Sequence, residues 1–441
     1  MNELDLKVLG EALRKVRKKR GLRLKDLEDE QISFATISSI ERGVPTVKPQ
    51  NRLYYCQKLG FDASQIPSLI RQENDERNQI ENLLFLIETC IRLDCDAALK
   101  QIRKLQTQCK DDYMDMVCYL KGLCYVKKNK LKKAESFFLQ SIDMIEKKNS
   151  STEPNIKSAC LYELGQIYYH RDNQLYKALD YNEQGLNAFQ PGKNRSDLYD
   201  FLMIAKVTYL EKLYRIDEAL QTLSDLWTQI EQINSLEVKL YMYELKASLL
   251  NQKKKYDEAL QYAREGLHIA RTNGAHEQAV ELLTVWGNIL QNAKDYHTAE
   301  NCYQLALRLE SKLKDKKVLL VSTLTQLGKL YNKMNKSREA YVSLSTAVER
   351  GKKYNDAHRY CESLMALGDY YIGSEQYQKA ISPYDEALHI ASSYNFTRQI
   401  EKALLNLSEC WKKLGDKEKY IKTLDELQKQ LRLRDLEVIE V

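Results

Sequence analysis

Amide side chains recur at nearly constant intervals in the middle of this 441-residue chain, at Asn251, Gln291 and Asn332. An amide can donate a hydrogen bond to a peptide carbonyl and accept one from a peptide N–H at the same time. A row of amides in register can therefore hold the backbone of an extended peptide, whatever the side chains of that peptide are. The polar neighbours of these amides complete the candidate peptide-binding set, which is Asn251, Gln252, Asn288, Gln291, Asn292, Lys329, Asn332 and Lys333.

The two lysines add a positive charge to one end of this set. We expect Lys329 and Lys333 to pair with a terminal or side-chain carboxylate of the peptide. The competing interpretation is that all of these residues are solvated polar positions on an open helical surface. The agreement of three successive positions in register favours binding.

The first sixty residues indicate a second kind of chemistry. They contain 13 Lys and Arg against 8 Asp and Glu, a net charge of +5, whereas the rest of the chain contains 55 and 54, a net charge of +1. A local basic excess of this kind is typical of a surface that meets a polyanion such as nucleic acid.

Short helices are predicted throughout this basic segment. Leu9, Leu13 and Val16 recur at helical spacing in a first helix that ends at Gly21, and a short second helix follows over residues 24–30. A third helix begins after Ser33, a typical N-cap residue, and ends at Gly43. A fourth helix runs over residues 49–60, with a proline in its first turn. A tight turn between the second and third helices predicts a helix-turn-helix.

Residues 7–62 resemble the Xre/Cro-like helix-turn-helix family. The resemblance rests on LGEALRKVRKKRGLRLKDL, ISFATISSIERG and the P-Q-N-R-L-x-x-x-x-K-L-G pattern that follows. It implies that Arg17 pairs with Glu41 of the E-R-G motif and so fixes the third helix against the first.

The same resemblance implies contacts with double-stranded DNA. The implied DNA-binding residues are Arg23, Lys25, Phe34, Ala35, Ser38, Ser39 and Arg42. Phe34 and Ala35 can contact thymine methyl groups, and a serine hydroxyl can donate or accept. Thr-Gln usually opens the second helix in this family, whereas Arg23-Leu24 stands here, so we expect Arg23 or Lys25 to replace one phosphate contact. The alternative is a helix-turn-helix that contacts only protein.

Beyond residue 77 the chain repeats one motif. Copies such as TQLGKLYNKMNKSREAYVSLSTAV share L-G-x-x-Y, then an alanine about twelve residues later, then a large residue four positions on. The alanine or its equivalent stands at positions 98, 134, 178, 219, 259, 299, 340, 380 and 420, the last of these being a tyrosine. This pattern resembles the tetratricopeptide repeat, which implies a right-handed superhelix of about nine hairpins whose first helices line a concave surface.

The predicted protein is therefore all-α. It comprises a helix-turn-helix domain (1–65), a linker rich in charge (66–77) and a tetratricopeptide-repeat domain (78–441). The combination resembles the RRNPP family of regulators, which includes NprR-like, PlcR-like and Rap-like proteins. This resemblance implies a quorum-sensing transcription regulator that binds a short signalling peptide in the groove, changes its homodimer or higher oligomer, and thereby changes DNA binding.

Two other functions stay open at the level of sequence. One is a Rap-like response-regulator phosphatase or antagonist, for which no catalytic glutamine can be placed. The other is a repeat scaffold that gathers protein partners. Independent enzyme chemistry is not expected, because the chain has no glycine-rich phosphate loop, nucleophile motif or metal-ligand cluster.

The composition also predicts the cellular compartment and the kinds of site that the chain lacks. No apolar run approaches the length of a membrane span and the first residues do not resemble a signal peptide, so we expect a cytoplasmic protein without membrane contact. The ten cysteines include no C-x-x-C pair and the six histidines are scattered. We therefore expect free buried thiols, no metal site and no cofactor.

Overall fold

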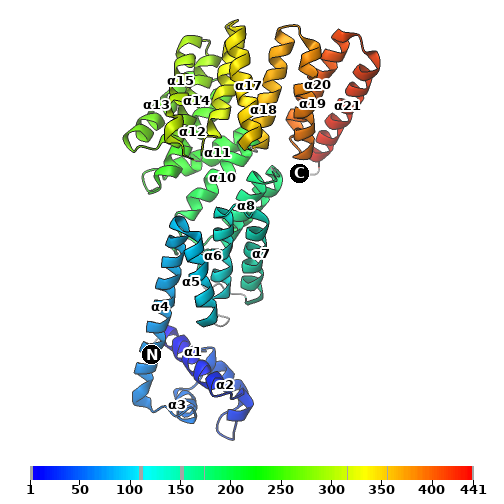
Figure 1. Ribbon diagram of the computed structural model, residues 1–441. Helices are drawn as coiled ribbons and strands as arrows, with labels where there is room; N and C mark the ends of the chain where they lie inside the picture. The colour runs from blue at the N-terminus through cyan, green and yellow to red at the C-terminus, as the bar shows by residue number, and fades with distance from the viewer. Residues whose placement is uncertain are drawn as a thin grey trace. The chain divides into compact units, whose positions relative to one another are not determined.

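The computed structural model describes residues 3–108, 113–148, 153–172, 174–314, 316–354 and 356–439 (Figure 1). The described residues form helices joined by short turns and contain no strand. The chain divides into two compact units, Met1–Gln108 and Cys109–Val441. The all-α prediction is confirmed.

The first unit contains the basic segment and the two helices that follow it. Its helices are α1 (Glu3–Lys19), η1 (Leu24–Leu27), α2 (Phe34–Glu41), α3 (Pro49–Lys58), η2 (Ala63–Gln65), α4 (Ile66–Leu93) and α5 (Cys95–Gln108). The hydroxyl of Ser33 accepts a hydrogen bond from the Thr36 N–H and caps α2 as expected. The predicted helix over 24–30 is only a single 3-10 turn.

Residues 66–77, which were expected to be a linker, are instead the first turns of the 28-residue helix α4. Lys15 Nζ of α1 lies 2.5 Å from Glu73 Oε1, and the Glu73 side chain is only 6% exposed. Ile66 is buried in the core of this unit as well. The charged residues of this segment suggested a solvated linker, but Glu73 forms an ion pair with Lys15 of α1.

The second unit is a stack of antiparallel helix pairs. Its helices are α6 (Met114–Lys127), α7 (Leu131–Lys148), α8 (Ile156–His170), α9 (Leu175–Ala188), α10 (Leu198–Lys212), α11 (Ile216–Trp227), α12 (Leu236–Gln252), α13 (Tyr256–Thr272), α14 (His276–Asn292), α15 (Tyr296–Arg308), η3 (Leu309–Lys312), α16 (Leu319–Lys333), α17 (Ser337–Tyr354), α18 (Ala357–Gly373), α19 (Tyr377–Ser393), α20 (Thr397–Leu414) and α21 (Lys417–Ile439).

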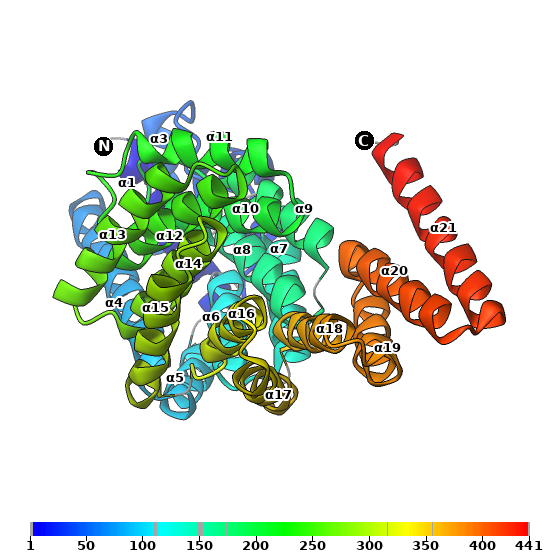
Figure 2. The same ribbon diagram turned by 90° about the horizontal axis from the view of Figure 1, so that it is seen from above.

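Eight hairpins, from α6/α7 to α20/α21, form this stack within the described residues, and α4/α5 forms another in the first unit. Successive first helices pack on one another, as α12 does on α14 and α14 on α16. Figure 2 shows α12, α14 and α16 on the inside of the curve, with α13, α15 and α17 outside them. The predicted helical repeat superhelix is confirmed.

The repeat residues explain the close packing within each hairpin. The alanines that open the second helices, from Ala98 to Ala380, are fully buried. On the first helix, a β-carbon added at Gly287 would lie 2.5 Å from the ring of Tyr303. A β-carbon at Gly368 would meet the ring of Tyr384 at the same distance. A small residue is therefore needed where the large residue of the second helix crosses the first.

Candidate binding groove and DNA-facing helix

The first helices of the second unit enclose a polar cavity of about 500 Å³. Six of them contribute to it, namely α8, α10, α12, α14, α16 and α18. The residues that line the cavity are Tyr169, Thr208, Glu211, Lys212, Tyr214, Tyr241, Glu244, Leu245, Ser248, Gln252, Glu281, Thr284, Val285, Asn288, Leu319, Ser322, Gln326, His358, Arg359 and Glu362. A cavity with many hydrogen-bonding groups and few apolar ones suits a polar ligand such as a peptide.

Glu211 joins two first helices on one wall of this cavity. Ser248 donates to Glu211 Oε1 at 2.5 Å, and Gln252 Nε2 donates to the same oxygen at 3.2 Å. Lys212 Nζ lies 3.8 Å from Glu211 Oε2. The negative charge of Glu211 raises the pKa of Lys212, so this amine stays protonated.

Arg359 spans three first helices on another wall. Its Nη1 donates to Asp356 at 2.7 Å, its Nε to Ser322 of α16 at 3.1 Å, and its Nη2 to Glu281 of α14 at 3.4 Å. Burial lowers the pKa of the neighbouring His358 imidazole, which favours the neutral ring. The guanidinium therefore holds α14, α16 and α18 together from inside the groove.

The structure separates the predicted peptide-binding residues into two groups. Gln252 and Asn288 line the cavity. The remaining six are not among its lining residues: Asn251, Gln291, Asn292, Lys329, Asn332 and Lys333. The expected row of Asn251, Gln291 and Asn332 therefore does not follow this cavity.

Hydrogen bonds show where the amides outside the cavity point. Asn292 Nδ2 donates to Asn251 Oδ1 at 3.1 Å, so one hydrogen bond joins these amides of adjacent repeats. Gln291 is buried, and its side-chain oxygen accepts from Tyr303 Oη at 3.2 Å. Tyr303 also donates to Asn288 Oδ1 at 2.8 Å. Gln291 follows Asn288 by three residues, which rotates its side chain by roughly 60° about the helix axis. The Gln291 side chain therefore points toward the second helix of its own hairpin.

Sequence reasoning missed the charged residues of the groove, although the repeat register contains a signal for them. The residue six positions before each repeat's small residue lines the cavity in four successive repeats: Tyr241, Glu281, Ser322 and Glu362. These four residues differ in chemical type, so the position does not appear in the sequence as a row of similar side chains. Only the curvature of the stack shows which stripe of the first helices faces inward.

In the first unit, α2 presents one face to solvent and one to the core. Ile37, Ile40 and Glu41 are buried, whereas Phe34 is 43% exposed. The residues predicted to face DNA on this helix share the outer face: Phe34, Ala35, Ser38, Ser39 and Arg42. Arg23 and Lys25 are also exposed, at η1.

Two of these residues already interact with each other. Ser39 Oγ donates to the Ala35 carbonyl at 2.9 Å and accepts from Arg42 Nη2 at 3.3 Å. Arg42 Nε also donates to the Ser38 carbonyl at 3.3 Å. The guanidinium is therefore held along the exposed face of α2.

A buried ion pair holds the inner side of α2, as the resemblance implied. Arg17 Nε donates to Glu41 Oε1 at 2.6 Å, and Arg17 Nη2 donates to Oε2 at 2.9 Å. Tyr55 of α3 donates to Glu41 Oε1 at 2.6 Å, and Arg17 Nη1 donates to the Leu22 carbonyl at 2.7 Å. Burial, together with the Glu41 carboxylate, raises the pKa of Tyr55. One network therefore connects α1, α2 and α3.

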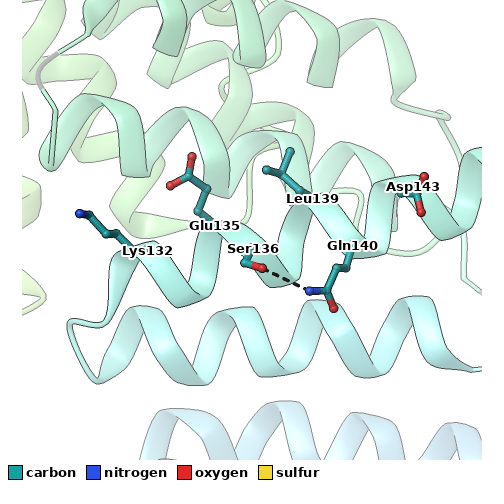
Figure 3. Close-up of a pocket in the computed structure, with 6 residues that line it drawn as sticks. All are labelled: Lys132, Glu135, Ser136, Leu139, Gln140 and Asp143. Carbon is teal, nitrogen blue, oxygen red and sulfur yellow. Dashed lines mark hydrogen bonds between the residues drawn. The ribbon is translucent and has the colours of Figure 1, made fainter.

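A depression of about 450 Å³ on α7 lacks the features of a binding site (Figure 3). Its lining residues all come from that one helix: Lys132, Glu135, Ser136, Leu139, Gln140 and Asp143. Gln140 Nε2 donates to Ser136 Oγ at 3.2 Å. Glu135 accepts from Arg171 at 2.7 Å and from Tyr168, so its carboxylate is already satisfied within the repeat stack.

Among the described residues, none of the helices combines the length and apolar character needed to cross a membrane. The same part of the chain contains no group of three His, Cys, Asp or Glu side chains that could hold a metal ion. Buried thiols are present, and burial raises the pKa of Cys160 to about 12. Cys109 lies outside the described residues.

Comparison with known proteins supports the repeat fold. The tetratricopeptide-repeat family model matches residues 117–148. No curated protein matches the chain. Among solved structures, a Rap protein complexed with Competence and Sporulation Factor is 14% identical with a TM-score of 0.57, over 81% of this chain and 98% of that one.

Two further structures are similar over most of the chain. The apo quorum sensor NprR from B. thuringiensis is 12% identical with a TM-score of 0.55, over 77% of this chain and 96% of that one. The Rap conjugation gene regulator of plasmid pLS20, in complex with the Phr* peptide, is 14% identical with a TM-score of 0.51, over 80% and 94%. At these identities the likeness shows a shared helical repeat superhelix.

Proposed function

We propose that this protein is a peptide-responsive transcription regulator. In this proposal the exposed face of α2 reads double-stranded DNA, and the cavity inside the repeat superhelix binds a short signalling peptide. The observation that carries the proposal is the presence, in one chain, of a basic unit with an exposed polar helix face and a repeat unit with a polar cavity. Two of the similar structures contain a signalling factor or a peptide, which agrees with this assignment of the cavity.

The geometry of α2 supports the DNA-binding half of the proposal. Ser38 and Ser39 carry hydroxyls, which can serve base edges, and Arg42 is exposed beside Ser39; in this proposal Arg42 contacts a phosphate. A helix-turn-helix reads two half-sites as a dimer, so the protein acts as a homodimer or higher homo-oligomer in this proposal. Such a role places it in the cytoplasm.

Selection of genomic DNA fragments by the full-length protein tests the proposal. We expect a discrete set of fragments to be retained, with an affinity that falls steeply as salt rises because phosphate contacts release counterions. Arg42→Ala should weaken binding to specific and random DNA alike, since a phosphate contact carries no sequence information.

The control is Arg338→Ala, which removes another exposed arginine, from α17 of the repeat unit. This variant should bind DNA as the unaltered protein does. Equal losses in the two variants would count against the assignment of α2. Absence of any retained fragment would favour the Rap-like interpretation or the scaffold, neither of which requires an operator.

A further inference from the structure

Five lysines stand within seven residues at the turn between α6 and α7, at positions 127, 128, 130, 132 and 133. Like charges so close together repel one another, so this run adds no stability to the turn. The last three of these lysines line a pocket of about 560 Å³ in the second unit. The run is therefore part of a concave surface.

The pocket joins elements that are distant in the sequence. The α6/α7 turn and the start of α7 supply the lysines, and Arg171 comes from the end of α8. The ends of α17 and α19 supply Tyr354 and Tyr394. This pocket shares no lining residue with the cavity of the groove, so it is a separate site.

Positive charge dominates the pocket. Lys130, Lys132 and Lys133 line it, and no Asp or Glu is among the described residues that do so. Within the described part of the chain, Lys130 and Lys132 have no carboxylate partner, and both are exposed. The groove cavity is different in this respect, because four carboxyl side chains line it against one lysine and one arginine.

The nearest carboxylates are already paired. Arg171 Nη1 lies 2.7 Å from Glu135 Oε2, and Arg171 Nη2 lies 2.5 Å from Asp172 Oδ2. Glu135 also accepts a hydrogen bond from Tyr168. These two carboxylates therefore hold the guanidinium and leave the charge of the three lysines available to a ligand.

Two tyrosines add aromatic surface to the same pocket. The Tyr394 ring is stacked on Phe396, with ring centroids 5.9 Å apart and an interplanar angle of 23°, so its position is fixed by packing. A nucleobase can stack on such a ring whatever its hydrogen-bonding pattern. The volume of the pocket lies within the range of small-molecule sites.

We propose that this pocket binds a nucleotide, with its phosphates on Lys130, Lys132 and Lys133 and its base against Tyr354 or Tyr394. A lysine ammonium is a common partner of phosphate oxygens, and the three lysines match the several charges of a nucleoside triphosphate. The inference goes beyond the proposed function, because it requires neither DNA binding nor a peptide in the groove.

Calorimetry of the full-length protein with ATP, GTP, tripolyphosphate and adenosine tests this inference. We expect ATP or GTP to bind, with an affinity that falls as salt rises. Tripolyphosphate should bind about tenfold more weakly or worse, because it has no base to stack. Adenosine, which lacks the phosphates, should show no measurable binding.

Lys130→Ala combined with Lys132→Ala should lower the affinity for the nucleotide by about tenfold or more, since two charged contacts are lost. The matched control is Lys147→Ala combined with Lys148→Ala, which removes the same charge from the exposed far end of α7 and should leave the affinity unchanged. Thermal unfolding without ligand checks that both variants keep the fold.

The tyrosines are tested by Tyr354→Leu combined with Tyr394→Leu. This variant should bind the nucleotide no more tightly than tripolyphosphate, while its affinity for tripolyphosphate should stay that of the unaltered protein. The comparison separates stacking of the base from a general loss of structure, because a misfolded pocket would lose both ligands.

Failure of both ATP and GTP to bind, or equal losses in the two lysine variants, would overturn the inference. Tripolyphosphate binding as tight as that of the nucleotides would overturn the assignment of a nucleotide. Loss of affinity for random duplex DNA in the Lys130 and Lys132 variant, without nucleotide binding, would also overturn it and assign these lysines to nucleic acid.

Discussion

At the residue scale, the network around Glu41 is the best-defined feature of the first unit. Its two oxygens accept hydrogen bonds from Arg17 and Tyr55, and the Arg17 and Glu41 side chains are only 9% and 5% exposed. A buried ion pair adds little net stability over an apolar pair, but removing one partner strands the other charge in the core. The network therefore fixes the orientation of α2 more than it adds stability.

Glu41→Ala should lower the free energy of unfolding of the first unit by about 3–5 kcal/mol, because Arg17 then stays buried without its carboxylate. Urea denaturation, followed by a probe placed in the first unit, measures this change. Glu11→Ala removes a carboxylate from an exposed ion pair with Arg77 of the same unit, 3.4 Å in length, and should cost about 1 kcal/mol or less. Similar losses for the two variants would contradict the structural role of Glu41.

At the element scale, the hairpin is held by the crossing of a small residue with a large one. The turns of several successive hairpins share one conformation: the residue five positions before the repeat alanine has a positive φ at Lys254, Lys294 and Asn335. At these positions the left-handed conformation ends the first helix and redirects the chain. The contact between the small and the large residue and the turn that joins the two helices together determine the geometry of a hairpin, and the stack repeats this geometry.

Gly287→Ala should destabilise the second unit by about 1–3 kcal/mol, because the new β-carbon would lie 2.5 Å from the Tyr303 ring and force a shift of packed helices. Gly373→Ala is the control, since its β-carbon would meet only the Asn332 amide, at 3.6 Å. That variant should be neutral or slightly stabilised by helix propensity. Thermal unfolding of the full chain compares them, and a neutral Gly287→Ala would show that the hairpin adjusts freely.

At the scale of the whole molecule, the two proposed activities lie in different compact units. The DNA-facing residues belong to the first unit, and the cavity belongs wholly to the second. Changes in the cavity should therefore affect the response to peptide and leave peptide-free DNA binding intact. The neighbouring amides Gln252 and Asn251 allow a comparison within one helix, because only Gln252 lines the cavity.

Gln252→Ala should lower peptide affinity by about 1–3 kcal/mol, or roughly 5- to 150-fold, because a polar group of the peptide loses its partner in the groove. Asn251→Ala should have little effect, since that amide bonds with Asn292. Calorimetry with a selected peptide, paired with DNA binding by the same variants, checks both expectations. A larger effect at Asn251 than at Gln252 would restore the amide row predicted from the sequence.

The sequence by itself determined the local structure of this protein. The cap at Ser33 and the register of the repeat alanines follow from short-range patterns of polarity and size, whereas the pairing of Arg17 with Glu41 was implied by the resemblance to the helix-turn-helix family. The structure contains all three. The resemblance to the tetratricopeptide repeat implied that the first helices line a concave surface, and the sequence predicted polar residues on it. Short-range patterns misjudged residues 66–77, because the charges there resemble a solvated linker until α1 supplies their partners.

Only the tertiary structure decided which stripe of the first helices faces inward. The inward direction depends on the small rotation between successive hairpins, which accumulates over the stack and is not encoded in any one repeat. This rotation brings Glu244, Glu281 and Arg359 from three separate helices into one cavity and turns Gln291 away from it. The charge of the groove is thus a property of the assembled superhelix, because these residues are tens of positions apart in the sequence and come together only when the hairpins stack.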